Sequence, residues 1–248
     1  MTGAIGVLLF ILGLLIGSFL NAYIYRLSVR GSVWRGRSYC PQCQHQLSAR
    51  DLIPLVSFIA LRRACRYCRK KISWQYPLVE LATALSWVGL FWYFGLTIDT
   101  AVYCLWTAIL IVIFVYDLKH QLILDRVTIP AGFIIFITAF FLDANFVNLL
   151  LAGIIGGSFF LIQYLSTKGR WVGGGDIRLG VLMGLMLGWP KVLLAIAVAY
   201  IIGAFVGMIL LLTKRKKMDS HIPFGTFLTL ATYLIFFIGD RVIENYFR

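Results

Sequence analysis

The stretch IVIFVYDLKHQ, residues 111–121, decides the fold. It closes a charge-free run over 100–116, and polar residues follow directly after Asp117. A helix of roughly 20 apolar residues crosses a bilayer. We therefore predict a membrane-spanning helix that ends where hydrocarbon gives way to water, with Asp117 at that border.

The rest of the chain has the same character. Its 248 residues are 60% hydrophobic and 13% charged, with a mean hydropathy of +0.88, whereas a soluble domain carries about 25% charged residues. This composition predicts an all-α polytopic membrane protein of about eight transmembrane segments. The sixth run, LGVLMGLMLGWP, is short, so we expect a half-helix or tilted segment ending at Trp189-Pro190. The charge-free runs are 1–25, 81–98, 100–116, 127–142, 144–167, 179–190, 192–213 and 222–239.

The basic residues predict the orientation. With the N-terminus outside, 20 of the 23 lysines and arginines fall on the cytoplasmic side, including the run KRKK at 214–217. The first run, 1–25, lacks a basic flank and a cleavage site, so we expect a retained span and not a signal peptide. The net charge of +13 is then explained by contact with anionic lipid, and we expect no nucleic-acid partner.

Three parts follow from this order: a first transmembrane helix at 1–25, a cytoplasmic loop at 26–80, and a seven-segment membrane body at 81–248. The loop contains CPQC at 40–43 and CRYC at 65–68. Two such pairs are typical of a structural four-thiolate zinc site, and a reducing cytoplasm argues against disulfides. The predicted ligands are Cys40, Cys43, Cys65 and Cys68, whereas Cys104 lies in an apolar span and is expected to pack as a hydrophobe.

Two of the ten acidic residues stand out. Asp117 ends the third span, and Asp176 follows three glycines, Gly173, Gly174 and Gly175, at the start of the sixth segment. A carboxylate at the membrane border is a functional candidate. Two that come close share a proton, so one can activate water while the other donates to a carbonyl oxygen. We interpret the glycines as a hinge loop that admits a substrate strand.

Other acids have simpler interpretations. We expect Asp125 to be an N-cap of the fourth span and Asp219 to cap the last helix or balance its lysines. The chain contains neither the HExxH motif of a zinc protease nor the GxSxG motif of a serine hydrolase. Two non-protease hypotheses remain: a transporter that binds protons or ions on the paired aspartates, and a scaffold for pilus or secretion machinery without catalysis.

Several ordered motifs resemble the type IV prepilin peptidases, a family of GxGD membrane aspartic proteases. They cover nearly the whole chain: GSFLNAYIYRL at 17–27, the CxxC pairs, DLIPLVSF at 51–58, ISWQYPLVE at 72–80, YDLKHQLILD at 116–125, GGGD at 173–176 and IPFGTF at 222–227. The chain departs from the family at Leu124-Asp125, where a proline often precedes the acid.

The resemblance implies that Asp117 and Asp176 are the catalytic pair. It implies removal of a basic leader from prepilins or pseudopilins at the inner or plasma membrane of a bacterium. The system served stays open between type IV pili, type II secretion and DNA uptake. It also implies N-methylation of the new N-terminus with S-adenosylmethionine, associated with the zinc-bearing loop. Glu80 and Lys71 lie near that part of the chain, but a solvated charge explains them equally well. No residues of the methyl-donor pocket are predicted.

Overall fold

The computed structural model describes residues 2–29, 31, 36–213 and 223–246. They form helices and irregular loops, with no strand beyond two isolated bridges in this described part. Seven helices are long and apolar enough to cross a membrane: α1 (Thr2–Ser28), α3 (Gln75–Phe94), α4 (Ile98–His120), α5 (Asp125–Thr138) with η2 (Ala139–Leu142), α6 (Phe146–Thr167), α8 (Lys191–Leu212) and α9 (Phe224–Tyr246). The prediction of an all-α membrane protein is confirmed.

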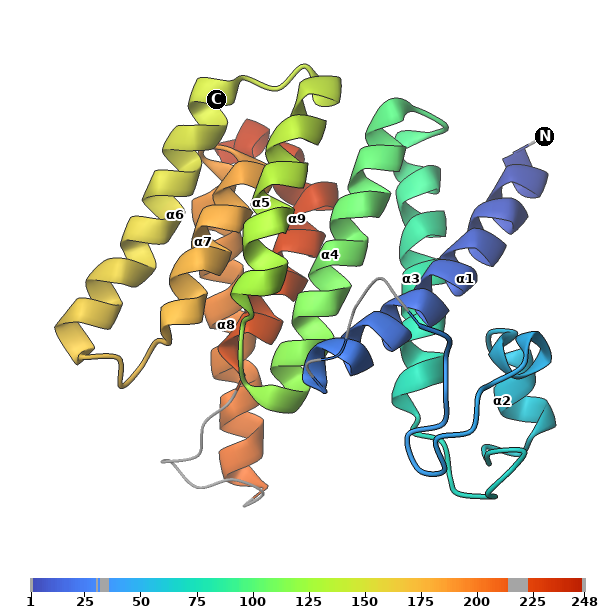
Figure 1. The fold of residues 1–248 in the computed structure, drawn as a ribbon. Coiled ribbons are helices and arrows are strands. Elements are labelled where there is room, and N and C mark those ends of the chain that lie inside the picture. The colour runs from blue at the N-terminus through green and yellow to red at the C-terminus, as the bar shows by residue number, and fades with distance from the viewer. Residues whose placement is uncertain (1, 30, 32–35, 214–222, 247–248) are drawn as a thin grey trace. The chain divides into compact units, whose positions relative to one another are not determined.

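The chain divides into two compact units, Met1–Ala108 and Ile109–Arg248. In the first unit α1 packs along α3 because α1 presents glycines to its neighbour (Figure 1). A Cβ on Gly13 would lie 2.5 Å from Ala84 Cα, and one on Gly17 would lie 2.6 Å from Glu80 Cα. Small residues four apart allow membrane helices to approach this closely.

Buried polar side chains tie the two helices to each other and to the loop that joins them. Asn21 of α1 is 1% exposed; its Nδ2 donates to the Tyr76 carbonyl at 3.0 Å, and its Oδ1 accepts from Gln75. Glu80 of α3 is also buried, and its Oε2 accepts from the Leu55 N–H at 2.9 Å. The loop carries two short elements, η1 (Ala49–Leu52) and α2 (Val56–Ala60).

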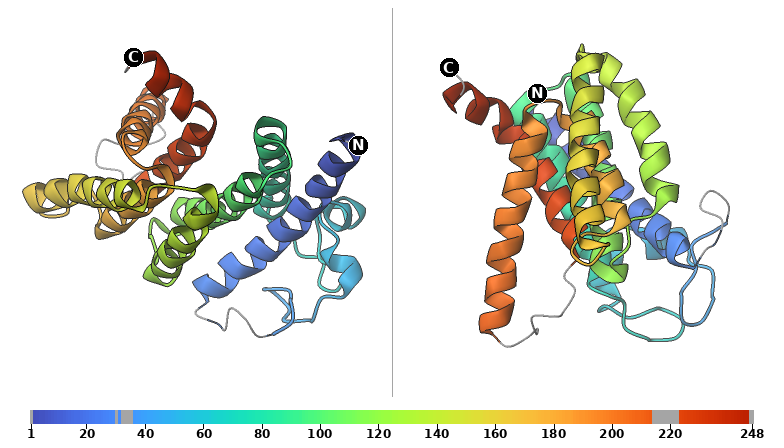
Figure 2. Two further views of the ribbon diagram at one scale, coloured as in Figure 1. Left: turned by 90° about the horizontal axis from the view of Figure 1, so that it is seen from above. Right: turned by 90° about the vertical axis from the view of Figure 1, so that its left-hand side faces the viewer.

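The second unit is built around a short central helix, α7 (Gly174–Leu187), which contacts α5, α6, α8 and α9 (Figure 1). Figure 2 shows α8 and α9 running side by side next to it. Glycines again allow the closest approach: a Cβ on Gly156 of α6 would lie 2.4 Å from the Gly180 carbonyl of α7. The short sixth segment is therefore a buried element of 14 residues.

Three expectations have different outcomes. The N-cap prediction for Asp125 is wrong, because α5 begins at Asp125 itself and its N-cap is Leu124, which makes no side-chain cap. The sixth segment ends at Leu187, before the predicted Trp189-Pro190, because Gly188 adopts a φ of 70° that favours glycine. The predicted cap at Asp219, the basic run 214–217 and the start of the 222–227 motif lie outside the described residues.

Candidate functional site

Asp117 lies in the last turn of α4 and points at the start of α9. It is 4% exposed, and its Oδ2 accepts a hydrogen bond from the Thr226 N–H at 2.9 Å. The carboxylate lies so close to Gly225 that a Cβ on this glycine would be 2.8 Å from Oδ2. Because helix N-termini carry free N–H groups and a partial positive charge, α9 offsets part of the cost of burying this acid.

Asp176 lies in the first turn of α7 and is 7% exposed. Its Oδ2 accepts from the Gly173 N–H at 2.9 Å, and its own N–H donates to the Gly173 carbonyl at 3.1 Å. It therefore caps the helix on which it stands. Both candidate carboxylates are thus held by backbone donors at a helix N-terminus, and no basic side chain pairs with either among the described residues.

One side chain of the α4–α5 loop joins the two carboxylate sites. Ile123 packs against both Gly175 and Gly225. A Cβ added to Gly175 would lie 2.8 Å from the Ile123 Cβ, and a Cβ added to Gly225 would lie 3.0 Å from the Ile123 Cδ1. Gly175 precedes Asp176, and Gly225 borders Asp117. The structure therefore brings Asp117 and Asp176 into one buried site within the second unit.

The three glycines before Asp176 occupy different environments. Gly173 is the N-cap of α7, and Gly174 and Gly175 are its first two residues, all with negative φ. A Cβ on Gly174 would meet nothing within 4 Å, whereas one on Gly175 would clash with Ile123. Close packing thus requires glycine at Gly175 alone. The movement of a hinge loop stays a prediction.

Three further acids, one in the second unit and two in the first, are already engaged. Asp125 pairs with Arg178 of α7, and each side chain is about half exposed. Asp51 pairs with Arg66, and Glu80 is buried against Leu55. None of the three is a free anion that could attract a basic peptide. His120 ends α4, where its ring stacks on Tyr116 at 4.5 Å.

The four predicted cysteine ligands converge in the loop of the first unit. The Sγ atoms of Cys40, Cys43, Cys65 and Cys68 all lie within 4.8 Å of one another, and those of Cys40 and Cys68 are 3.9 Å apart. Four sulfurs at about 2.3 Å from a tetrahedral ion would be about 3.8 Å apart. The cluster therefore fits a metal ion, while Cys104 is buried in α4 as expected.

The two halves of this cluster, 39–46 and 64–71, have the same backbone geometry. In each, the first cysteine's N–H donates to the carbonyl five residues on, at 2.9 Å in both halves. Its carbonyl accepts from the N–H four residues on, at 2.9 and 3.0 Å. That fourth residue has a φ of 58° in one half and 60° in the other. The sequence shows this repeat only as the CxxC spacing, because the other residues differ.

The contacts between the halves follow the same symmetry. The ring of His45, five residues after Cys40, stacks on Tyr67 at 3.6 Å. At the corresponding positions with the halves exchanged, Lys70, five residues after Cys65, donates from Nζ to Gln42 Oε1 at 3.5 Å. The sequence does not reveal these four positions, because their side chains share no chemistry.

Asp51 braces the second half from outside. Its carboxylate accepts from Arg66 Nε at 2.7 Å, from Ser48 Oγ at 2.8 Å and from the Tyr67 hydroxyl at 3.2 Å. Burial alone would raise the pKa of the Asp51 carboxyl. The hydrogen bonds from Arg66 and Ser48 outweigh that effect and lower this pKa to about 2.

Two family profiles match the chain. "Bacterial Peptidase A24 N-terminal domain" covers residues 11–94, and "Type IV leader peptidase family" covers residues 104–208. No solved structure matches.

Curated relatives named "Prepilin leader peptidase/N-methyltransferase" match over most of their length. The protein from Stutzerimonas stutzeri is 31% identical, with 96% of this chain and 92% of the relative covered. The protein from Bacillus subtilis is 31% identical, with 97% of each covered, and that from Legionella pneumophila is 31% identical, with 94% and 91% covered. The chain therefore belongs to the type IV leader peptidase family, peptidase A24, of bacterial multi-pass membrane proteins.

Proposed function

We propose that Asp117 and Asp176 are the catalytic pair with which this chain removes the leader peptide from type IV prepilins or pseudopilins. The observation that carries the proposal is the convergence of two buried carboxylates in one site, where the described part of the chain offers them backbone donors and no basic side chain. An arginine or lysine partner would hold either acid permanently ionised. Without one, two neighbouring carboxyls can share a single proton.

The chemistry follows from that shared proton. The ionised carboxylate removes a proton from water as the water oxygen attacks the scissile carbonyl carbon. At the same time the protonated carboxyl donates its proton to the carbonyl oxygen. The carbon–nitrogen bond then breaks: the amine leaves with a proton from the pair, and the other carboxylate takes a proton back from a hydroxyl of the tetrahedral intermediate as the new carboxyl group forms. The pair returns to one shared proton, so the aspartates need no metal for this step. We do not assign the proton to one aspartate, because interacting acids titrate together.

The cysteine cluster has a separate role in this proposal. Cys40, Cys43, Cys65 and Cys68 would hold a structural zinc ion, and a four-sulfur site leaves no open position for substrate. The ion would fix the loop within 26–80 beside the first helix, 1–25. The N-methylation named for the relatives would use S-adenosylmethionine and this loop, whereas the body at 81–248 would perform the cleavage.

The same proposal sets the topology. The N-terminus lies outside the cytoplasm of a bacterial inner or plasma membrane, and both aspartates face the cytoplasmic side. The end of α4 and the start of α7 lie at the same end of the second unit, which supports a site at one membrane face (Figure 1). A transporter site at the midplane with access from both faces agrees less well with this placement. Prepilins and membrane lipid are the partners, and nucleic acid is not.

The test uses the purified full chain in detergent or lipid with a full-length prepilin, followed by intact mass. Asp117→Asn and Asp176→Asn should each slow cleavage by at least about 1,000-fold. Asp125→Asn, which removes an exposed acid at the same end of the unit, is the matched control and should stay within about twofold. Normal cleavage by both Asn variants of the pair would disprove the proposal. A further methyl mass that requires S-adenosylmethionine would establish the second activity.

A further inference from the structure

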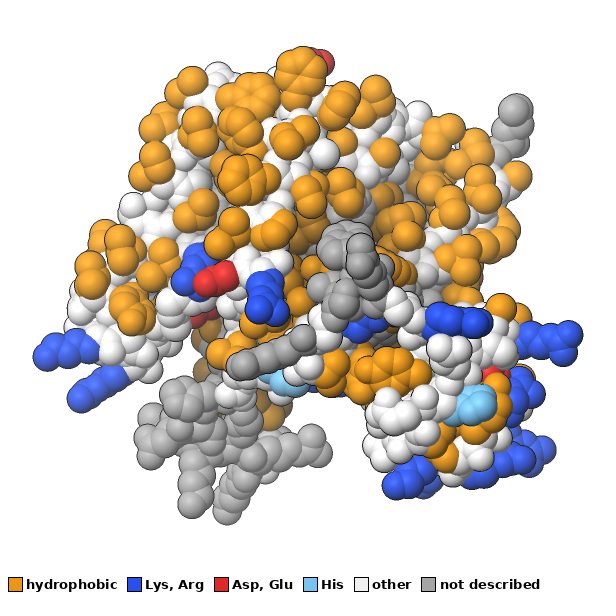
Figure 3. Space-filling view, in the orientation of Figure 1, with side chains coloured by type: hydrophobic (Ala, Val, Ile, Leu, Met, Phe, Trp, Pro, Cys, Tyr) orange, Lys and Arg blue, Asp and Glu red, His pale blue; other side chains and the backbone are white. Residues whose placement is uncertain are grey.

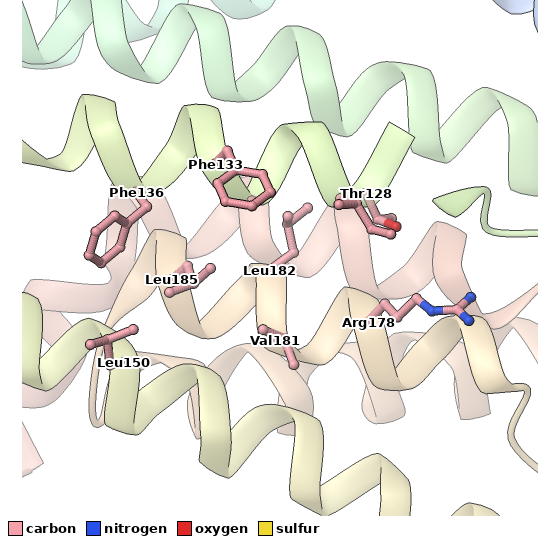
Figure 4. A pocket seen from close by; sticks show the side chains of 10 residues that line it. Thr128, Phe133, Phe136, Leu150, Arg178, Val181, Leu182 and Leu185 are labelled. Carbon is pink, nitrogen blue, oxygen red and sulfur yellow. The ribbon is translucent and has the colours of Figure 1, made fainter. Parts of the chain in front are cut away.

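A groove runs along the outside of the second unit, between α5, α6 and α7. Phe133 and Phe136 of α5 form one wall, Leu150 of α6 forms the other, and Leu182 and Leu185 of α7 form the floor (Figure 4). Its volume is about 400 Å³, within the range of small-molecule sites. The groove is apolar over most of its length, so its occupant must present hydrocarbon there.

Gly132 makes room in the middle of this groove. A Cβ on Gly132 would meet only the Leu182 Cδ1 atom, at 3.9 Å. At the far end Phe136 packs against Phe146 of α6, with ring centroids 5.1 Å apart and the rings tilted by 57°. The groove therefore ends in an apolar contact between α5 and α6.

The other end of the groove carries a positive charge. Arg178 and Thr128 lie there together, at the same end of α7 as Asp176 (Figure 4). Arg178 pairs with Asp125, but a guanidinium has five N–H donors and can bind a second anion at the same time. The Thr128 hydroxyl donates to the Leu124 carbonyl at 3.2 Å, so Arg178 is the donor at this end of the groove that can bind an anion.

Further cations lie at the same end of the second unit, although only Arg178 lines the groove. Arg126, Lys168 and Arg170 are exposed and have no carboxylate partner among the described residues. Figure 3 shows hydrophobic side chains over α5 and α6, with Lys and Arg gathered where the α6–α7 loop lies. Asp125 neutralises only one of these four cations. The site thus combines an apolar groove with an excess of positive charge at one end.

We propose that this groove binds an anionic phospholipid, with one acyl chain lying between α5 and α7 and the phosphate on the Arg178 guanidinium. Arginine binds phosphate through two parallel hydrogen bonds. Basic residues between helices near the cytoplasmic face are the typical site of anionic headgroups. The bound lipid would stabilise the contact between α5 and α7, which the Arg178–Asp125 pair makes at the same place.

The geometry favours a lipid over the substrate peptide. Successive residues of a helix are about 100° apart, so Arg178, Leu182 and Leu185 lie on one side of α7 and Asp176 lies on the opposite side. An occupant of the groove therefore has α7 between itself and the aspartate site. The proposal does not depend on the peptidase chemistry.

Native mass spectrometry of the purified full chain tests the proposal directly. Dioleoyl phosphatidylglycerol and dioleoyl phosphatidylcholine, which have the same acyl chains, are the two probes. We expect tighter binding of phosphatidylglycerol. Arg178→Gln should weaken that binding about fivefold, the effect of one cation near an anionic headgroup. It should weaken phosphatidylcholine binding less, because the choline cation of that lipid offsets the charge of its phosphate. Gly132→Leu, which fills the groove, should weaken the binding of both lipids.

Lys191→Gln is the matched control, because Lys191 also forms an ion pair, with Asp240, and lies at the opposite end of the unit. A phosphatidylglycerol with a diazirine on one acyl chain should crosslink to peptides of α5, α6 and α7. Equal loss of binding in Arg178→Gln and Lys191→Gln would overturn the proposal, as would crosslinks confined to other helices. Stoichiometric displacement of the lipid by a prepilin would identify a peptide site instead. If Gly132→Leu does not fold, the two charge variants still decide.

Discussion

The cysteine cluster and the aspartate pair each assemble residues from separate parts of the chain, but by different means. The cluster joins two copies of one short backbone motif, 39–46 and 64–71, with the same hydrogen bonds and the same positive φ. The aspartates come from two helices and are positioned by backbone groups and glycines of a third helix and a loop. We therefore expect the arrangement of the cysteines to be stabilised by a bound metal ion, whereas the arrangement of the aspartates is stabilised by the packing of the second unit.

The largest expected effect breaks the cluster without touching the aspartates. Cys65→Ser removes one buried ligand, and structural zinc sites contribute about 10 kcal/mol of folding free energy. We expect bound zinc, measured by elemental analysis, to fall from one ion per chain to nearly none. Limited proteolysis should then cut within 38–71. The control is Cys104→Ser, which should leave the zinc content unchanged; equal loss in both variants would contradict the assignment of the four ligands.

The next test moves the Asp117 carboxylate while leaving its chemistry intact. In Gly225→Ala the new Cβ would be 2.8 Å from Oδ2, so the carboxylate must shift. Misplacement of a catalytic group by about 1 Å costs about 100-fold in rate, and we expect a loss of this order in prepilin cleavage. Alanine raises helix stability by about 1 kcal/mol over glycine. A thermal unfolding midpoint at or above the wild-type value would therefore exclude unfolding as the cause, whereas full activity would show that this contact does not position Asp117.

The difference between the two regions also decided what the sequence could predict. The cysteine ligands, the membrane helices and the short α7 follow from spacing and hydropathy, which are local properties. Asp117 and Asp176 were predicted as the catalytic pair because acidic residues are few in this chain and these two border apolar segments. Gly225, Thr226 and Ile123 were missed as builders of the site, because their contacts join segments as far as 109 residues apart. Only the proximity of Gly225 and Thr226 to a helix start hinted at donors for a buried acid.

The glycines before Asp176 allow a comparison within a single motif. Gly175→Ala places a Cβ 2.8 Å from Ile123 Cβ, which is attached to the backbone and cannot rotate away. The start of α7 must then move, and we expect cleavage to slow about tenfold, since smaller displacements cost less than the 1 Å case. Gly174→Ala adds the same atom in open space and should remain within about twofold. Equal losses in both variants would instead favour a hinge that needs all three glycines.

The smallest effect concerns the brace of the cysteine cluster. Asp51 has a pKa of about 2 in the folded chain, below the value of about 3.9 of an unfolded aspartate. Its contribution is therefore complete above pH 4 and is lost as the pH falls toward 2. Because Arg66 is half exposed, we expect Asp51→Asn to lower the free energy of unfolding by only about 1 kcal/mol at neutral pH.

The measurement is the guanidinium concentration at which a chromogenic chelator captures half of the zinc. Arg66→Gln should give a similar shift, and the double variant should add little to either one. Additive shifts would mean that the two side chains stabilise the loop independently, and that the second half of the cluster is held by its cysteines alone.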